Sequence, residues 1–526
     1  MKLLCLLIIP LFVCHFVSAQ LSSRPNILFI MSDDHAAPAV GVYGSHLAKL
    51  NPTPCIDRLA AEGVLFENAF CHNSICTPSR ASILTGQYSQ TNGVLDLDDA
   101  LEVSQQYLPI EMKRLGYSTA MIGKWHLKNE PGQFDYYKVL PSQGLYFDPD
   151  FREKGQGTWP NNIVQSKGHS SDIITDSTID YLRTLDLSKP FFIMHHYKAP
   201  HDDFEYAPRY SDYLANVTIP EPDTLFNHDG FGSVATRGEN DSLRTVIGSS
   251  VSNRHEVRNY VKNYVRNASL SPVESTRLSY QTYLKDYLRC VKGIDDNLER
   301  LFDELKTKGL WENTIIVYTS DQGFMLGAHD LIDKRWMYEE SMQIPLVIRF
   351  PQQGLSGIRS DLLVNNTDFA PTLIELAGGS APEYMQGRSF VKTLQGIPES
   401  DWRTATYYRY WMHMIHHWVP AHFGIRTKNH KLIFYYGRNY RPEEAFKNFY
   451  WGLPESEYDG YLGPTPTAWE FYDLKNDPEE KTNQYANPEY QTVIRELKKS
   501  LFEQREALDE TDQKYPEIEK IIQANR

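Results

Sequence analysis

The sequence is poor in cysteine. Only six of its 526 residues are cysteine, and two of them, Cys5 and Cys14, lie in an apolar N-terminal segment. The four that remain cannot form the dense network of a disulfide-stabilised scaffold. With 41% hydrophobic residues, the chain is instead expected to fold around one large core with an appendage, or around two or three smaller ones.

The chain also lacks an excess of positive charge. It has 53 Lys and Arg against 67 Asp and Glu, for a formal net charge of −14. Loss of Lys2 with a cleaved leader would take this to −15, because −14 − 1 = −15. Such a balance argues against general binding to nucleic acid or to anionic membranes. An anionic substrate must therefore be bound by cations gathered at one place.

No long hydrophobic run follows the N-terminal segment. Met1 and Lys2 precede the apolar residues 3–13, and small residues lead to a cleavage point after Ala19. This order is typical of a signal peptide, which we predict over residues 1–19. Val13, directly before Cys14, does not suit lipoprotein processing. We therefore expect a periplasmic or secreted protein without a membrane anchor.

Apolar runs that end in polar residues recur along the first four hundred positions. Such runs suit strands that are buried on both faces, and the segments between them have helical periodicity. The pattern predicts an α/β fold with a doubly wound, largely parallel sheet. Ligands of such sheets bind beyond the carboxyl ends of the strands, where the polar residues should meet. The runs cover residues 26–31, 118–123, 190–194 and 314–319.

The composition and hydrophobic pattern of the sequence change near residue 400. Aromatic-rich runs alternate with turns from there, and a helix is expected over residues 488–508. We predict a main domain over residues 20–400 and a smaller antiparallel-sheet subdomain over residues 401–526. The polar residues 222–272 have the character of an insertion, either a plain surface loop or a substrate-contacting segment.

The most informative motif lies in residues 71–86. Cys76, Pro78 and Arg80 place a thiol just upstream of a short helix, with Pro78 in the first turn and Gly86 at the exit. The positive end of the helix dipole and the arginine both favour an anion beside Cys76. For Cys76 alone, the simpler interpretation is a half-buried structural cysteine before a helix. This interpretation does not explain the whole motif of residues 71–86.

Two pairs of oxygen-bearing residues follow predicted strands. Asp33 and Asp34 come after the first run, and Asp321 and Gln322 come after the last. Either pair alone would suit a solvated turn or a helix cap. Together at one sheet edge they offer three carboxylates and an amide oxygen, which are ligands that Ca²⁺ or Mg²⁺ prefers.

These motifs resemble those of the type I sulfatases. The resemblance rests on Cys-x-Pro-x-Arg followed by Ala-Ser-Ile-Leu-Thr-Gly, on Gly-Lys-Trp-His, Ala-Pro-His and Asp-Lys-Arg-Trp, and on residues 469–479. It extends from Pro25 to about Asn487 and is strongest to exported bacterial glycan sulfatases. It implies an alkaline-phosphatase-like fold and oxidation of Cys76 to Cα-formylglycine by a formylglycine-generating or sulfatase-maturating enzyme.

The resemblance also implies roles for individual residues. Lys124, His201 and Lys334 would bind the sulfate oxygens, and His201 or Lys334 would protonate the departing sugar oxygen. Arg80 would hold the modified residue or the sulfate, and His126 would remove a proton in the step that releases sulfate. The implied catalytic residues are Cys76, Arg80, Lys124, His126, His201 and Lys334. The implied ligands of one Ca²⁺ are Asp33, Asp34, Cys76, Asp321 and Gln322.

The expected activity is hydrolysis of sulfate esters of carbohydrates. We expect short oligosaccharides from extracellular polysaccharides as substrates, with algal glycans such as ulvan or carrageenan first and glycosaminoglycans of the N-acetylglucosamine-6-sulfate type second. A phosphonate or phosphodiester hydrolase of the same superfamily is the alternative enzyme. A glycan-binding protein without turnover is the alternative outside enzymes. With Cys76 modified, Cys55, Cys71 and Cys290 allow at most one disulfide.

Overall fold

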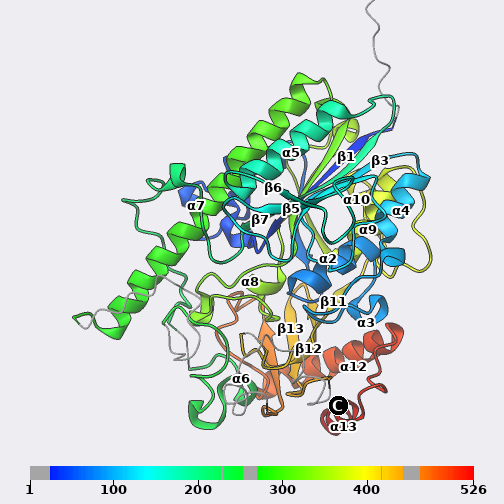
Figure 1. Cartoon of the computed structure of the whole chain (residues 1–526). Helices are drawn as coiled ribbons and strands as arrows, with labels where there is room; N and C mark the ends of the chain where they lie inside the picture. The colour runs from blue at the N-terminus through cyan, green and yellow to red at the C-terminus, as the bar shows by residue number, and fades with distance from the viewer. Residues whose placement is uncertain (1–23, 227–228, 253–268, 416, 442–462) are drawn as a thin grey trace, which may run out of the picture.

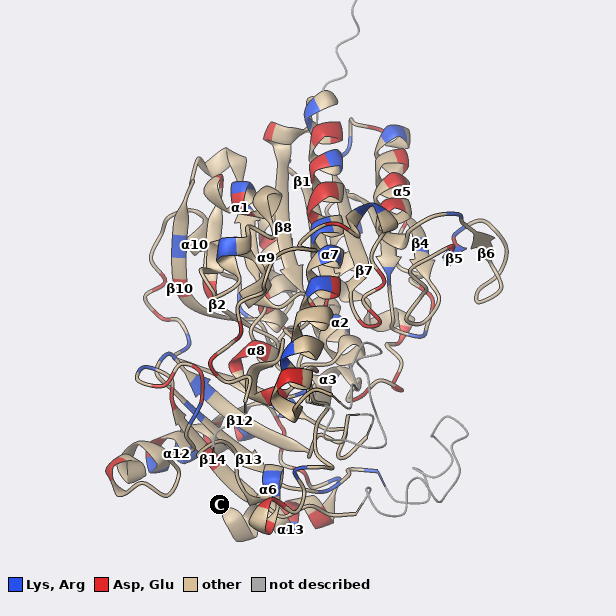
Figure 2. Ribbon diagram, turned by 90° about the vertical axis from the view of Figure 1, so that its left-hand side faces the viewer, with Lys and Arg blue, Asp and Glu red and all other residues tan. Residues whose placement is uncertain are grey.

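The computed structural model describes residues 24–226, 229–252, 269–415, 417–441 and 463–526. The predicted signal peptide, residues 1–19, lies outside these ranges. Within them, no helix combines the length and the apolar character that crossing a membrane requires. Figure 2 shows acidic and basic residues interspersed along α7 (Pro272–Thr307), whereas the charged residues of α5 (Ser170–Thr184) are mainly acidic.

A large mixed sheet forms the centre of the protein (Figure 1). Its strand order in the described chain is β10-β2-β9-β8-β1-β7-β3-β4-β5-β6. The four strands β8, β1, β7 and β3 are adjacent and parallel, whereas β9, β5 and β6 run antiparallel to their neighbours. The largely parallel α/β sheet predicted from the sequence is thus confirmed. The strands are β1 (Asn26–Asp33), β2 (Val64–Phe70), β3 (Ser118–Lys124), β4 (Tyr136–Leu140), β5 (Asp150–Glu153), β6 (Ile163–Gln165), β7 (Phe191–Pro200), β8 (Thr314–Ser320), β9 (Leu346–Arg349) and β10 (Ile358–Asn365).

Helices cover both faces of this sheet because its central strands are apolar on both sides. Leu28 and Ile30 of β1 belong to one core, and Phe29 and Met31 belong to the other. The first core includes α5, α7 and α1 (Pro54–Ala61). The second includes α2 (Cys76–Thr85), α4 (Tyr107–Arg114), α9 (Phe369–Leu376) and α10 (Val391–Leu394).

The long helix α7 begins at a capping box. The Ser271 hydroxyl accepts a hydrogen bond from the Glu274 amide, and the Glu274 carboxylate accepts one from the Ser271 amide at 2.8 Å. Pro272 occupies the first turn, where its missing N–H costs no hydrogen bond. Four of the described α-helices have only four residues each: α10, α3 (Ser89–Asn92), α6 (Val234–Arg237) and α8 (Glu339–Met342).

A second, antiparallel sheet lies beyond the large one and carries the C-terminal helices (Figure 1). It consists of β11 (Ala405–Tyr410), β12 (His422–Thr427), β13 (His430–Tyr435) and β14 (Ala468–Asp473). One face packs on α12 (Gln491–Ala507) and α13 (Pro516–Asn525), and the other packs on Trp336 and its neighbours. The predicted antiparallel sheet and its helix are present. The second helix, α13, was not predicted from the sequence.

Candidate active site

The four central strands bring the predicted site residues together. Met31 of β1 pairs with Thr319 of β8, so the strands end level with each other. The polar residues that follow these strands therefore meet at one edge of the sheet. The residues at this edge are Asp33 at the end of β1 and Asp34 directly after it, Lys124 from β3, His201 after β7, and Asp321 and Gln322 after β8.

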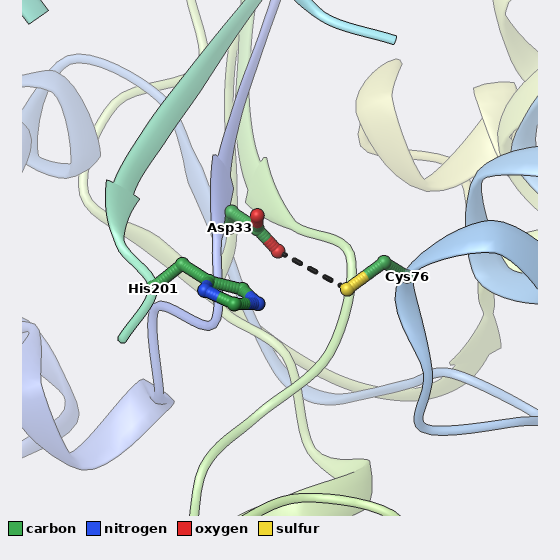
Figure 3. Close-up of side chains that lie close together, drawn as sticks. All are labelled: Asp33, Cys76 and His201. Carbon is green, nitrogen blue, oxygen red and sulfur yellow. Dashed lines mark hydrogen bonds between the residues drawn. The ribbon is translucent and has the colours of Figure 1, made fainter. Parts of the chain in front are cut away.

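Cys76 is the first residue of α2 and faces this edge (Figure 3). Its thiol is 1% exposed and lies 3.5 Å from the Asp33 carboxylate. Burial, with a smaller contribution from Asp33, raises the pKa of the thiol to about 12, so the unmodified cysteine is a poor nucleophile. The helix ends as predicted at Gly86, which has the left-handed φ of 66° that favours glycine. The structure differs from the prediction only in placing Cys76 inside the helix.

Arg80 links the ends of two strands. Its Nε donates to Asp321 Oδ2 at 2.9 Å, and its Nη1 donates to the Lys124 carbonyl at 2.6 Å. The side chain is 2% exposed. In the described structure Arg80 therefore binds a carboxylate and a carbonyl of the protein itself. These two hydrogen bonds hold Asp321 and the end of β3 beside Cys76.

Three carboxylates form a group that suits a divalent cation. Single oxygens of Asp33, Asp34 and Asp321 lie within 4.8 Å of one another, and all three side chains are buried. Burial and repulsion from Asp33 raise the pKa of Asp321 to about 7, a cost that a bound cation would relieve. Oxygen donors of this kind fit Ca²⁺ or Mg²⁺.

Gln322 completes the set of oxygen donors. Its Nε2 donates to Asp34 Oδ1 at 2.6 Å, and its buried Oε1 has no hydrogen-bond partner among the described residues. A half-turn of the amide exchanges the two atoms and directs Oε1 towards the carboxylates. The residue types present therefore fit a cation bound by three carboxylates and one amide oxygen.

Two buried lysines lie on either side of the carboxylates. Lys124 contacts Asp33, and Lys334 donates to Asp34 Oδ2 at 2.5 Å. Burial alone would lower the pKa of Lys334, but the Asp34 carboxylate holds it well above its ordinary value. Lys334 therefore remains positively charged at neutral pH.

The two predicted histidines have different surroundings. His126 has a left-handed φ of 54°, and its buried Nδ1 has no hydrogen-bond partner in the described chain. Burial and then Lys124 lower the pKa of His126 well below its ordinary value, so the ring is neutral and can accept a proton. His201 Nδ1 lies 2.7 Å from the Asp202 carbonyl, and its Nε2 lies 3.8 Å from Asp34 Oδ2. Its ring lies near Asp33 and Cys76 (Figure 3).

The structure adds polar residues that sequence reasoning did not select. Asp202 contacts His201 Nδ1 through its carboxylate, which directs Nε2 towards the site. Beside Lys334, the buried Asp333 carboxylate pairs with Arg335 at 2.7 Å and with His417 at 3.1 Å. Asp202 follows His201 in the sequence and Asp333 precedes Lys334, so their position beside predicted residues could have identified them. His417 lies far from these residues in the sequence, and no such indication was present.

Part of the suspected insertion packs beside this group. Phe231 stacks on His329 with 3.8 Å between ring centroids. The Asp330 carboxylate accepts hydrogen bonds from the amide and hydroxyl of Ser252, the latter at 2.6 Å. These contacts attach residues 229–252 to the loop that carries Lys334, and residues 253–268 lie outside the described ranges. The four described cysteines, Cys55, Cys71, Cys76 and Cys290, are buried and form no disulfide.

Comparison with known proteins identifies the family to which this arrangement belongs. The family described as "Sulfatase" matches residues 25–380, and the family "N-sulphoglucosamine sulphohydrolase, C-terminal" matches residues 327–446 and 461–507. The chain belongs to the sulfatase family. It is an enzyme that hydrolyses sulfate esters, and it has the alkaline-phosphatase-like fold that the resemblance implied.

Individual relatives of this sulfatase are similar over nearly the whole chain. An N-acetylglucosamine-6-O-sulfatase of Bacteroides thetaiotaomicron is 37% identical, with 93% of this chain and 88% of the relative covered. A solved structure described as a complex with its substrate D-glucosamine-2-N,6-O-disulfate is 35% identical, with a TM-score of 0.79 and 93% and 99% coverage. An ulvan-active sulfatase of Formosa agariphila is 26% identical over 92% of this chain and 80% of that protein.

A phosphonate monoester hydrolase of Agrobacterium radiobacter has the same fold. Its solved structure has a TM-score of 0.68 and 20% sequence identity, with 92% of this chain and 96% of the other covered. Identity at this level supports the architecture and carries no information about the substrate of this sulfatase.

Proposed function

We propose that this sulfatase removes a 6-O-sulfate group from glucosamine units of short sulfated oligosaccharides. The observation that carries the proposal is the 37% identity to the N-acetylglucosamine-6-O-sulfatase, which extends over 93% of this chain. The solved structure described with a glucosamine disulfate supports the same substrate class. Ulvan and carrageenan, which the sequence reading placed first, become the second candidates because the ulvan-active relative is only 26% identical.

The proposed chemistry depends on a modified Cys76. Oxidised to Cα-formylglycine, this residue would supply, as the aldehyde hydrate, an oxygen nucleophile that the thiol cannot provide. Because Cys76 is 1% exposed in the folded chain, a maturation enzyme must reach it before folding is complete. This order fits a protein that is modified during synthesis and exported through the predicted signal peptide.

The surrounding side chains bind the sulfate and transfer protons. Lys124, Lys334 and His201 Nε2 would donate hydrogen bonds to the sulfate oxygens and offset their charge. Either Lys334, which stays protonated, or His201 would give a proton to the departing sugar oxygen. The neutral His126 ring would accept the proton that is lost when sulfate is released. Arg80, held by Asp321 and the Lys124 carbonyl, would act by positioning these groups.

A calcium ion would be held by the buried oxygen donors Asp33, Asp34, Asp321 and Gln322, with the modified residue 76 as a further ligand. Its charge would offset the carboxylates and favour the deprotonated nucleophile.

The test combines mass analysis with sulfate release. The protein is purified from a host that has a maturation enzyme, and the mass of the peptide containing Cys76 reports its oxidation. Release of sulfate is then measured on glucosamine 6-sulfate, on ulvan and carrageenan oligosaccharides, and on an aryl phosphonate. Oxidised protein should act best on the glucosamine ester. Faster turnover of the phosphonate would instead support the alternative enzyme class, for which the shared fold is the supporting observation.

A further inference from the structure

A glutamine outside the predicted catalytic set contacts the buried lysine at the end of β3. Gln143 Oε1 accepts a hydrogen bond from Lys124 Nζ at 2.5 Å. The same ammonium group contacts the Asp33 carboxylate. A lysine ammonium has three N–H donors, and these described contacts use two of them. The two hydrogen bonds fix the rotation of the ammonium group, and this rotation also fixes the direction of its third N–H. That third N–H remains for a ligand.

Gln143 belongs to a turn that the backbone makes possible. It lies in the connection between β4 and β5, between Ser142 with φ 50° and Gly144 with φ 69°. A Cβ atom at Gly144 would lie 2.7 Å from Leu140 Cδ1, so this turn requires glycine both for its backbone angle and for space. The turn directs Gln143 from the β4 side of the sheet back to Lys124.

The same connection also contacts the opposite side of the site. The buried Tyr146 hydroxyl donates to the His201 carbonyl at 2.5 Å, and the Lys198 ammonium lies 4.8 Å from the centroid of the Tyr146 ring. One short loop therefore contacts both Lys124 and His201. The loop is fixed by the contact of Gln143 with Lys124 and by the contact of Tyr146 with His201, so the position of the Gln143 side chain is well defined.

The chemical type of Gln143 suits the task. A carboxylate at this position would offset the positive charge of Lys124 and weaken its attraction for an anion. A neutral amide oxygen accepts the hydrogen bond and leaves the charge in place. A hydrogen bond to a charged group contributes more than one between neutral groups, so its loss should be measurable.

We propose that Gln143 is a positioning residue that directs the remaining N–H of Lys124 towards the sulfate group of the substrate. This inference rests on the proposed function, because it assumes that Lys124 binds sulfate. It deepens that proposal by naming a residue on which sulfate recognition depends and which contacts the sulfate only through Lys124.

The experiment uses the full-length, modified enzyme and three variants. Gln143→Met keeps the size of the side chain and removes the acceptor, and Gln143→Glu keeps the acceptor and adds a negative charge. Gln165→Met, at an exposed position of β6, is the matched control. For each protein, kcat and KM are measured on glucosamine 6-sulfate, together with the inhibition constants of inorganic sulfate and of unsulfated glucosamine.

We expect Gln143→Met to raise KM and the inhibition constant of sulfate together by about tenfold, with kcat changed less than about threefold. Gln143→Glu should raise both by a larger factor, because it also reduces the local positive charge. The inhibition constant of glucosamine should stay within about twofold, because no sulfate is involved. Gln165→Met should behave as the wild type.

An unchanged inhibition constant of sulfate in Gln143→Met would overturn the inference, as would an equal loss of affinity for glucosamine, which would indicate a general structural role. Should Gln143→Met fail to fold, Gln143→Leu, which also removes the acceptor without adding a charge, replaces it and gives the decision by the same two constants. A modified wild type that releases no sulfate would count against the proposed function itself, and inhibition or binding of inorganic sulfate would still test Gln143 separately.

Discussion

Two regions of this sulfatase bury several charged side chains, and they use them differently. The first is the strand-end site, formed by the residues that follow β1, β3, β7 and β8. The second is the arginine network, which lies between the small sheet and the C-terminal segment and consists of Arg409, Arg505, Glu510 and Asp512. All four of its members are buried.

The arginine network covers its cations with aromatic rings. The Arg409 guanidinium lies 3.4 Å from the centroid of the Trp411 ring and donates to Asp512 at 2.8 Å. Arg505 lies 4.0 Å from the centroid of the Phe423 ring and also contacts Asp512. Ring faces on one side and carboxylates on the other bind α12 and the residues after it to the small sheet.

Buried atoms without hydrogen-bond partners among the described residues occur in both regions. They include Gln322 Oε1 and His126 Nδ1 in the strand-end site, and Arg505 Nη1 and Glu510 Oε1 in the arginine network. The strand-end site differs in holding three carboxylates that lie close enough to bind one cation. Buried charge alone therefore does not mark a catalytic site. What distinguishes the site is that its donors and acceptors converge on a place for a ligand, and this contrast predicts which substitutions change activity and which change stability.

The largest effect is expected for Cys76→Ala. Turnover should fall by at least about 10⁴-fold, because the nucleophile is removed while the rest of the site remains. The melting temperature, measured by calorimetry, should change by less than about 3 °C. Cys290→Ala, which removes another buried thiol, should keep its activity per folded molecule. Sulfate release by Cys76→Ala near the wild-type rate would contradict the role of position 76.

Removal of the metal should have the next largest effect. Exhaustive chelation should reduce turnover by about 10³-fold or more, because the carboxylates would repel one another and the nucleophile would lose its stabilising charge. Adding Ca²⁺ back should restore activity, and adding Mg²⁺ in a parallel sample tests the choice of ion. Elemental analysis measures the metal content. Full turnover by protein shown to be free of metal would refute the proposed site.

Arg409→Met should destabilise the protein without changing its chemistry. The substitution leaves the buried Asp512 carboxylate with only part of its compensation, which should cost about 3 kcal/mol of unfolding free energy. Urea denaturation measures this loss. The kcat of the folded fraction should remain within about twofold of the wild type. A large fall in kcat with unchanged stability would remove the distinction between the two regions.

The smallest effect concerns the pH dependence of stability. Burial, and to a smaller extent Glu339, raise the pKa of Glu480 to about 7, despite its 2.7 Å contact with Lys431. The folded state therefore binds a proton that the unfolded state has lost, and stability decreases as pH rises from about 4.5 to 7.

Denaturation at several pH values checks this prediction. Relative to Glu480→Gln, the wild type should lose on the order of 1 kcal/mol between pH 5 and pH 8. Parallel pH profiles for the two proteins would show that Glu480 titrates normally. Activity per folded molecule should be the same in both.

Much of the strand-end site could be predicted from the sequence. The apolar runs before Asp33, Lys124 and Asp321 identify buried parallel strands, whose carboxyl ends must lie at the same edge. The contacts of Gln143 and His417 could not be predicted, because each depends on the path of a loop that no periodic pattern describes. α13 was missed for a different reason, since it is a short helix at the end of a polar segment.

The sequence by itself determined which chemical groups are present and at which strand ends they lie. The continuous apolar runs of the buried strands and the helix signals around Cys76 are local features, so they can be recognised without knowing which segments they pack against. Only the tertiary structure decided that Arg80 binds Asp321, that His126 is neutral and that Lys334 stays charged. Hydrogen bonding and protonation depend on burial and on distances between segments far apart in the chain, and packing alone sets both.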